Sequence, residues 1–280
     1  MKAHLLIITF FLAISNLAAT AQYYHRDIVN VKQAQEEKKA LQQQKIRTII
    51  VHSFEADGTS SEGFACEKNF SKDYKEMQTL TQSQITGKNW LTSYYNEKGL
   101  LQRSLDSSDI SVANTFYEYD NNDNIIKITS LTHSADEDFT TSLKEIHEYS
   151  YNANGKPVRM LRIKNGKDSS VINFVLDEKG NVTDEIEAGA NGKHFYYYYN
   201  DKNQLTDIVK YNEVKRGLRA DFIFEYDDEG HISQMTAVEE GVGSDYYTWK
   251  YTYNEGLRII EKCFSKSKQL MGYFEYEYQD

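Results

Sequence analysis

Long hydrophobic runs, surplus positive charge and cysteine are all scarce in this 280-residue chain. Its mean hydropathy of −0.67 argues against a polytopic helical membrane protein. With 42 acidic against 32 basic residues, its net charge of −10 argues against a surface built to neutralise phosphates, and so against nucleic acid as a partner. Of its two cysteines, none directly follows the apolar run at the start, so no lipid-attachment site is present. A high aromatic content, 13%, argues against bulk disorder.

The first 21 residues have the pattern of a secretory signal peptide. Lys2 supplies the positive charge, Leu5 to Ile14 form the apolar region, and small residues at Ala19 and Ala21 form the cleavage pattern. The apolar region is too short to span a bilayer, which takes roughly 20 residues in a helix. We therefore expect a secreted or periplasmic protein that starts at Gln22, with no membrane insertion after cleavage.

A polar helix is expected after the leader, within the segment 22–47. The helix is predicted over residues 28–46, because Gln35 to Gln44 are almost all strong helix formers and Asn30 with Gln33 has the spacing of a capping box. The apolar seam is thin and consists of Ile28, Val31, Ala34 and Leu41. A helix this polar is expected to lie over a sheet edge or to act as a spacer.

One pattern then recurs through residues 90–280. In order, it consists of an aromatic residue, any residue, a second aromatic residue, Asn or Asp, two polar residues and Gly. The last aromatic or aliphatic residue of each copy falls at positions 95, 119, 151, 176, 199, 226, 253 and 278. Regular spacing of about 25 residues is typical of a repeat protein. A degenerate earlier copy is at Phe54 to Gly58.

The pattern has the chemistry of a β-hairpin turn. Asp or Asn at the first turn position accepts hydrogen bonds from the backbone just ahead, and the residue three positions later must adopt positive φ to close a type I turn with a bulge. That position is held only by residue types that enter the left-handed region easily: Gly99, Asp123, Gly155, Gly180, Asn203 and Gly230.

These hairpins predict an all-β domain over residues 48–280, a long antiparallel meander of tandem hairpins in a curled sheet, preceded by the helix. The alternative is a β-propeller-like fold, in which hairpins pair two by two into blades. Alternation predicts one aromatic face, with Tyr197 and Trp249, and one charged face, with Glu118 and Lys250.

The stretches Tyr117 to Asp120 and Phe224 to Asp227 resemble the YD-repeat, or RHS-repeat, family. The resemblance covers roughly residues 90–280. In large members of that family the repeats form a shell around a toxic C-terminal domain. This chain has few repeats, its only proline is Pro157, so an Asp-Pro motif is absent, and we expect no passenger after Asp280. The resemblance therefore implies the fold of a short secreted member without a toxin domain.

Catalytic signatures are missing from the sequence. The histidines do not fall at metal-ligand spacing, and no zincin, nucleophile-elbow or P-loop motif occurs. Asp120 to Asn124 imitates a calcium loop, but Ile125 and Leu131 stand where Gly and Glu are needed. The acidic insertion at 130–142 is interpreted as a solvated loop. We expect no enzyme, no cofactor and no metal.

Two pairs of residues are singled out. Cys66 and Cys263 would form a disulfide if the first and last hairpins meet, and would stay free if the sheet is open. Trp90 and Trp249 are the candidate platforms for a sugar ring, although aromatic residues in strand register usually belong to a core.

Two functions follow as hypotheses. The first is a non-enzymatic interaction or structural module that binds an envelope or extracellular protein. The second is a carbohydrate-binding module that uses exposed Tyr and Trp side chains. Exposure of Trp90 and Trp249 distinguishes them, because a buried indole offers no platform to a glycan. A hydrolase with an unrecognised carboxylate pair is a distant third and would need close carboxylates with raised pKa values.

Overall fold

The computed structural model describes residues 23–135, 142–190, 192–212, 216–239 and 245–280. The expected signal peptide at residues 1–21 and the acidic stretch Asp136 to Asp138 lie outside these ranges. Within them the chain forms two compact units. We call Tyr23–Ile50, Ala65–Lys193 and Tyr278–Asp280 the helix unit, and Val51–Phe64 with His194–Glu277 the C-terminal unit. None of the described helical residues forms a segment long and apolar enough to cross a membrane.

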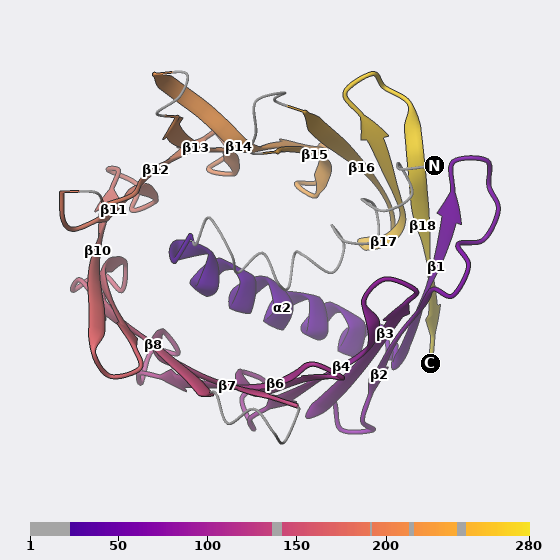
Figure 1. Cartoon of the computed structure of the whole chain (residues 1–280), viewed down its shortest axis with the longest axis horizontal. Coiled ribbons are helices and arrows are strands. Elements are labelled where there is room, and N and C mark those ends of the chain that lie inside the picture. Colours follow the sequence, from indigo (N-terminus) through magenta and orange to yellow (C-terminus); the bar gives the residue numbers. More distant parts are fainter. Residues whose placement is uncertain (1–22, 136–141, 191, 213–215, 240–244) are drawn as a thin grey trace. The chain divides into compact units, whose positions relative to one another are not determined.

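The helix unit contains the helix and a run of antiparallel strands (Figure 1). Its elements are α2 (His25–Gln43), β2 (Ala65–Phe70), β3 (Glu76–Ser83), β4 (Gly87–Tyr95), β5 (Leu101–Ser108), β6 (Ser111–Tyr119), β7 (Ile125–Ser134), β8 (Ser142–Tyr151), β9 (Pro157–Lys164), β10 (Asp168–Leu176) and β11 (Val182–Glu187). Strand β1 (Thr48–Glu55) begins in this unit and ends in the other.

The C-terminal unit continues the same pattern of short strands. Its elements are β12 (His194–Tyr199), β13 (Leu205–Asn212), β14 (Gly217–Tyr226), β15 (Ile232–Val238), β16 (Tyr246–Asn254), β17 (Leu257–Ser265) and β18 (Leu270–Gln279). Its core is aromatic: Trp249 and Phe274, both almost fully buried, stack with ring centroids 6.3 Å apart.

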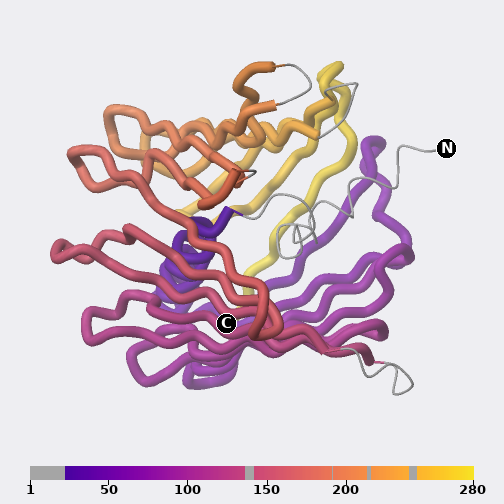
Figure 2. Tube along the Cα trace, turned by 60° about the vertical axis from the view of Figure 1, so that its left-hand side comes forward, coloured from indigo at the N-terminus to yellow at the C-terminus, as the bar shows by residue number. Residues whose placement is uncertain are grey.

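The predicted meander is confirmed within each unit. Every strand from β2 to β11 pairs antiparallel with the next, and so does every strand from β12 to β18. Figure 2 shows these hairpins following one another side by side along the chain. The propeller alternative is wrong for these units, because the hydrogen bonding continues from hairpin to hairpin and does not stop after four strands.

The turn rule is confirmed at all six predicted positions. Each has positive φ, between 63° at Asp123 and 93° at Gly230. Asp120 shows the local chemistry, because its Oδ1 accepts from the backbone N–H groups of Asn122 at 2.8 Å and Asn124 at 2.9 Å. The strand register shifts by one residue beside each turn, for example between Glu118 and Tyr119, as a bulge requires.

The repeated tyrosines connect neighbouring hairpins. In four repeats the tyrosine hydroxyl donates to the carbonyl of the first strand residue after the preceding turn: Tyr119 to Leu101, Tyr151 to Ile125, Tyr226 to Leu205 and Tyr253 to Ile232, at 2.6 to 3.0 Å. The bond satisfies a carbonyl at the point where the bulge disrupts the ladder. The tyrosine of the motif therefore fixes the distance between one hairpin and the next.

The helix differs from its prediction in two ways. It begins at His25 and ends at Gln43, so Asn30 lies inside it and is not a cap. It also lies across a face of the sheet in its own unit rather than over an edge (Figure 1). Its buried residues are Val31, Lys38 and Leu41, and Lys38 places its ammonium 4.7 Å from the centre of the Tyr95 ring. Polar contacts to tyrosines replace most of the apolar seam that such packing usually needs.

Candidate functional site

An exposed aromatic surface lies on the face of the helix-unit sheet opposite α2. Successive residues of a strand point to opposite faces, and Tyr95 contacts the helix, so Trp90 and Tyr94 of β4 point away from it. Trp90 is 41% exposed, Phe116 of β6 is 39% exposed, and Leu131 of β7 is 39% exposed. We call Trp90, Phe116, Leu131 and the residues between them on β4 to β7 the outer surface.

Arg103 of β5 joins the aromatic side chains of this surface. Its guanidinium lies 5.4 Å from the centre of the Tyr94 ring and 5.6 Å from that of Phe116, and the strand register places it directly opposite both residues. Its Nε and Nη2 both donate to Asn114 Oδ1. Stacking between two aromatic rings holds a planar cation in place and is favourable at exposed sites.

The outer surface ends at two hairpin turns. Ile85, in the turn between β3 and β4, is 44% exposed, and Ile110, in the turn between β5 and β6, is 78% exposed. Scattered exposed apolar side chains are ordinary on a protein surface, but a contiguous group is typical of an interaction site. Ile85, Trp90, Ile110, Phe116 and Leu131 all belong to the five strands β3 to β7 or to the turns that join them.

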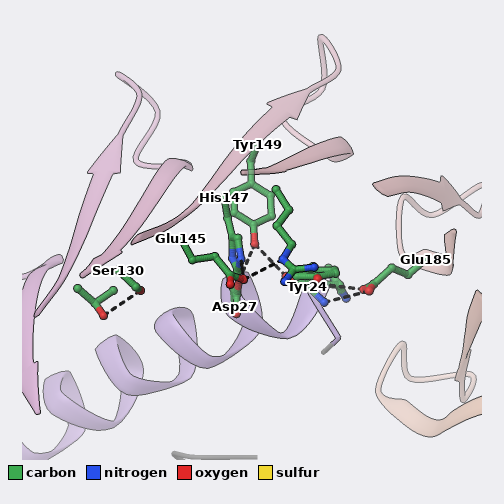
Figure 3. Close-up of polar contacts among 10 residues, drawn as sticks. Tyr24, Asp27, Ser130, Glu145, His147, Tyr149 and Glu185 are labelled. Carbon is green, nitrogen blue, oxygen red and sulfur yellow. Dashed lines mark hydrogen bonds and ion pairs between the residues drawn. The ribbon is translucent and has the colours of Figure 1, made fainter. Parts of the chain in front are cut away.

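A half-buried charge cluster occupies the other face, under the first turn of α2 (Figure 3). His147 of β8 contacts Asp27 of the helix through Nδ1 at 2.7 Å and Glu145 of its own strand through Nε2 at 2.9 Å. Arg162 of β9 donates from Nε to the same Glu145 oxygen at 3.0 Å, and the hydroxyl of Tyr149 donates to Asp27 at 2.7 Å. Two cations and two carboxylates thus alternate.

The pKa values of this cluster follow from its geometry. Burial alone would lower the pKa of His147, but the hydrogen bonds and charges of Asp27 and Glu145 raise it from 6.5 to about 9. The hydrogen bond from His147, together with Arg162, overcomes burial and lowers the pKa of Glu145 to about 2. A histidine that stays protonated is a poor general base at neutral pH, and a carboxyl that stays ionised is a poor general acid. The cluster is therefore suited to holding the helix.

Glu185 of β11 binds the start of the helix. Its two carboxylate oxygens accept the backbone N–H groups of Tyr24 at 3.0 Å and His25 at 2.9 Å (Figure 3). These N–H groups have no partner within a helix, and the helix dipole favours a negative charge at this end. Glu185 is only 1% exposed. This side chain, 160 residues from His25 in the sequence, caps the helix start in place of the predicted capping box.

The structure separates the two predicted tryptophan platforms. Trp90 is exposed on the outer surface, with the Lys88 ammonium 5.0 Å from its ring centre. Trp249 is 1% exposed and stacks on Phe274, so the prediction of a platform there is wrong. Both side chains follow the alternation of their strands, but Trp90 lies on a solvated face and Trp249 lies in a core.

Cys66 and Cys263 are both buried free thiols in this structure and belong to different units. The disulfide is not formed here, and its formation in the oxidised protein stays a prediction. Burial raises the pKa of both thiols, that of Cys263 to about 12, which makes them weak nucleophiles.

Sequence reasoning missed several residues of the cluster and the outer surface. His147 stands at no metal-ligand spacing from another histidine, and Glu145, Asp27 and Glu185 belong to no motif. The available signal was alternation: Glu145 and His147 are two residues apart on a strand whose Tyr149 continues the same face. Charged residues in line with a motif tyrosine indicate a polar patch on the buried face.

No family model matches the chain, and no curated protein matches it. Among solved structures, a chain of the Tc holotoxin pore of Photorhabdus luminescens matches with 12% identity and a TM-score of 0.34, over 77% of this chain and 12% of that one. A porin-like protein from Bacteroides uniformis matches with 8% identity and a TM-score of 0.37, over 84% of this chain and 98% of that one. The chain thus spans about an eighth of the toxin chain, and likenesses this weak carry no argument about function. The resemblance to the YD-repeat family stays a prediction.

Proposed function

We propose that the mature chain is a secreted or periplasmic, non-enzymatic interaction module that binds an envelope or extracellular protein through the outer surface. Trp90, Phe116 and Leu131 are exposed on one face of neighbouring strands, with Arg103 between Tyr94 and Phe116, and this exposure carries the proposal. Trp, Tyr and Arg dominate the energetics of protein interfaces, and this surface combines all three types on rigid neighbouring strands.

The hairpin repeats support this role by keeping the surface rigid. Each strand from β3 to β8 is hydrogen-bonded on both sides, and the tyrosine-to-carbonyl bonds fix successive hairpins to each other. A surface that is already ordered loses little conformational entropy when a partner binds.

A second candidate is carbohydrate binding at Trp90. The exposed indole on a sheet face favours it, because such a ring is a suitable surface for stacking against a sugar ring. Because Trp249 is buried, a change in emission on adding a glycan would report on Trp90. A panel of neutral and acidic polysaccharides, titrated into the mature protein and into Trp90→Phe, tests this candidate.

Site-specific photocrosslinking tests the protein-binding proposal. Position 110 lies at the rim of the outer surface and is 78% exposed, so a photoreactive phenylalanine analogue placed there would reach a bound partner. The matched control carries the same group at position 175, an exposed position of β10 outside the outer surface. We expect a discrete crosslinked protein from position 110 that Trp90→Ala abolishes. Identical products from both positions would refute the proposal.

A further inference from the structure

The charges around the outer surface identify the kind of partner that fits it. Lys88 of β4, Arg103 of β5 and Lys144 of β8 all point to this face, and Lys144 lies directly opposite Leu131. No described carboxylate forms an ion pair with any of the three. Three carboxylates share this face of the strands. Glu76 lies opposite Tyr94, and Glu118 and Glu148 both lie opposite Lys127, which forms an ion pair with Glu148 at 3.5 Å.

These three cations differ from Lys75 and Lys98 of the same unit, which pair with Glu97 and Asp123, both at 2.7 Å. Two of the three instead contact aromatic rings: Lys88 contacts Trp90, and Arg103 contacts Phe116. Only two donors of Arg103 are used by Asn114, so further donors of its guanidinium fork are available to a carboxylate.

We propose that the outer surface binds an acidic protein segment that also carries apolar side chains. This inference rests on the proposed function and specifies its partner. Carboxylates of the segment pair with Lys88, Arg103 and Lys144, while its apolar side chains contact Trp90, Phe116 and Leu131. Because neighbouring strands are ~4.8 Å apart, the distance from β4 to β8 is ~19 Å, which an extended segment of about six residues covers.

Charge complementarity favours this partner over the alternatives. A protein with a net charge of −10 repels an acidic segment on average, whereas the three cations without a carboxylate partner attract it locally, so the charge distribution contributes to specificity. A neutral glycan would make no use of the three cations. The headgroups of an anionic membrane would bind the same cations, so binding to anionic vesicles is a separate outcome of the test.

A phage-displayed library of random peptides, panned on the mature protein after depletion on Trp90→Ala, tests the inference. We expect the enriched sequences to be acidic with interspersed aromatic or leucine residues. One enriched peptide is then synthesised and titrated, with Trp90 emission as the readout. Arg103→Gln and Lys88→Gln should each weaken its binding on the order of tenfold, as for a central interface residue, and added salt should weaken it further. Lys167→Gln, in the turn between β9 and β10, is the charge-matched control.

The outcomes separate this inference from the function on which it rests. The acidic partner is refuted if the enriched peptides are neutral or basic. It is also refuted if no enriched peptide requires Trp90 for binding. So does an emission change with phosphatidylglycerol vesicles, or with a polysaccharide, in the absence of binding by acidic peptides. If the crosslink from position 110 still forms, the interaction module stands without the acidic partner. If that crosslink is absent as well, both the interaction module and the acidic partner are refuted.

Discussion

Single tyrosine hydroxyl groups hold one hairpin to the next in this chain, which has 22 tyrosines and 13 phenylalanines. A phenylalanine would supply the same apolar ring, but it would leave the carbonyl beside the bulge without a donor. This explains why the last aromatic position of the pattern is tyrosine in the repeats that end at Tyr119, Tyr151, Tyr226 and Tyr253.

Replacing one of these tyrosines measures the contribution of its hydroxyl. Tyr151→Phe removes the donor to the Ile125 carbonyl, which is bonded at 2.7 Å, and should lower the free energy of unfolding by about 1 kcal/mol. Urea denaturation followed by circular dichroism gives the value. Tyr94→Phe, whose ring stacks on Arg103 on the opposite face, is the control and should change stability much less. Equal losses in both variants would contradict the proposed bond.

The charge of His147 predicts a pH dependence. Its pKa is raised from 6.5 to about 9 in the folded protein, so its contribution to stability is complete below pH 6.5 and is lost as the pH rises through 9. The loss amounts to up to about 3 kcal/mol for a side chain as buried as this one. Glu145, with its pKa lowered from 4.5 to about 2, contributes above pH 4.5 and loses its contribution as the pH falls toward 2.

Thermal unfolding between pH 5 and pH 10 checks this prediction. Desolvation lowers the pKa of the half-buried His25 to about 4, so His25 loses its contribution to stability as the pH falls below 6.5, and its effect must be separated from that of His147. His147→Gln should therefore lower stability most below pH 6.5, where the contribution of His147 is complete, and flatten the fall in stability between pH 6.5 and pH 9. A curve that falls equally above pH 7 in both proteins would show that another group is responsible.

Hairpin turns are the elements that the sequence specifies most directly. At Gly155, φ is +70° and the nearest atom to an added Cβ, Asn124 Nδ2, is 3.8 Å away, so an added side chain meets no clash. Gly155→Ala should destabilise by about 1 kcal/mol through backbone conformation alone. Gly155→Asn should cost less, since asparagine enters the left-handed region more readily. Denaturant midpoints of the two variants give the comparison, and an alanine variant as stable as wild type would refute the turn assignment.

Docking of helix α2 on the sheet depends mostly on hydrogen bonds and ion pairs, because its packing is mostly polar. Glu185→Ala should leave the backbone N–H groups of Tyr24 and His25 without their acceptor, at a cost of about 2 to 4 kcal/mol. Hydrogen exchange should show faster exchange in residues 25–31 than in β4 or β5. Asp184→Ala, at the neighbouring position on β11, provides the control. Uniform acceleration throughout the helix unit would mean that Glu185 stabilises the whole unit.

Two units make up the molecule as a whole, and each cysteine is buried in a different one. We expect both thiols to resist alkylation in the native protein and both to react after denaturation without reductant, because burial raises their pKa values. Mass spectrometry after alkylation counts them. Absence of both labels in the denatured, unreduced protein would establish the disulfide that the oxidising compartment suggests.

The sequence alone determined the turns and the alternation of the strands, because both depend on local chemistry. The turn at Asp120, the positive φ at Asn203 and the alternation of Phe195 and Tyr197 into the core depend on neighbours within a few residues. Such interactions are encoded by residue type and spacing, so the meander and its turns could be predicted. The helix also forms where helix formers are concentrated, although its ends are decided by contacts with other elements.

Only the tertiary structure decided where the charged and exposed groups lie. Asp27 meets His147 across 120 positions and Glu185 meets Tyr24 across 161, and no local pattern relates residues so far apart. The two tryptophans have similar strand contexts, yet one is 41% exposed and the other 1%. Which face of a strand becomes core depends on what covers it: in the helix unit α2 covers one face, and Trp90 lies on the other.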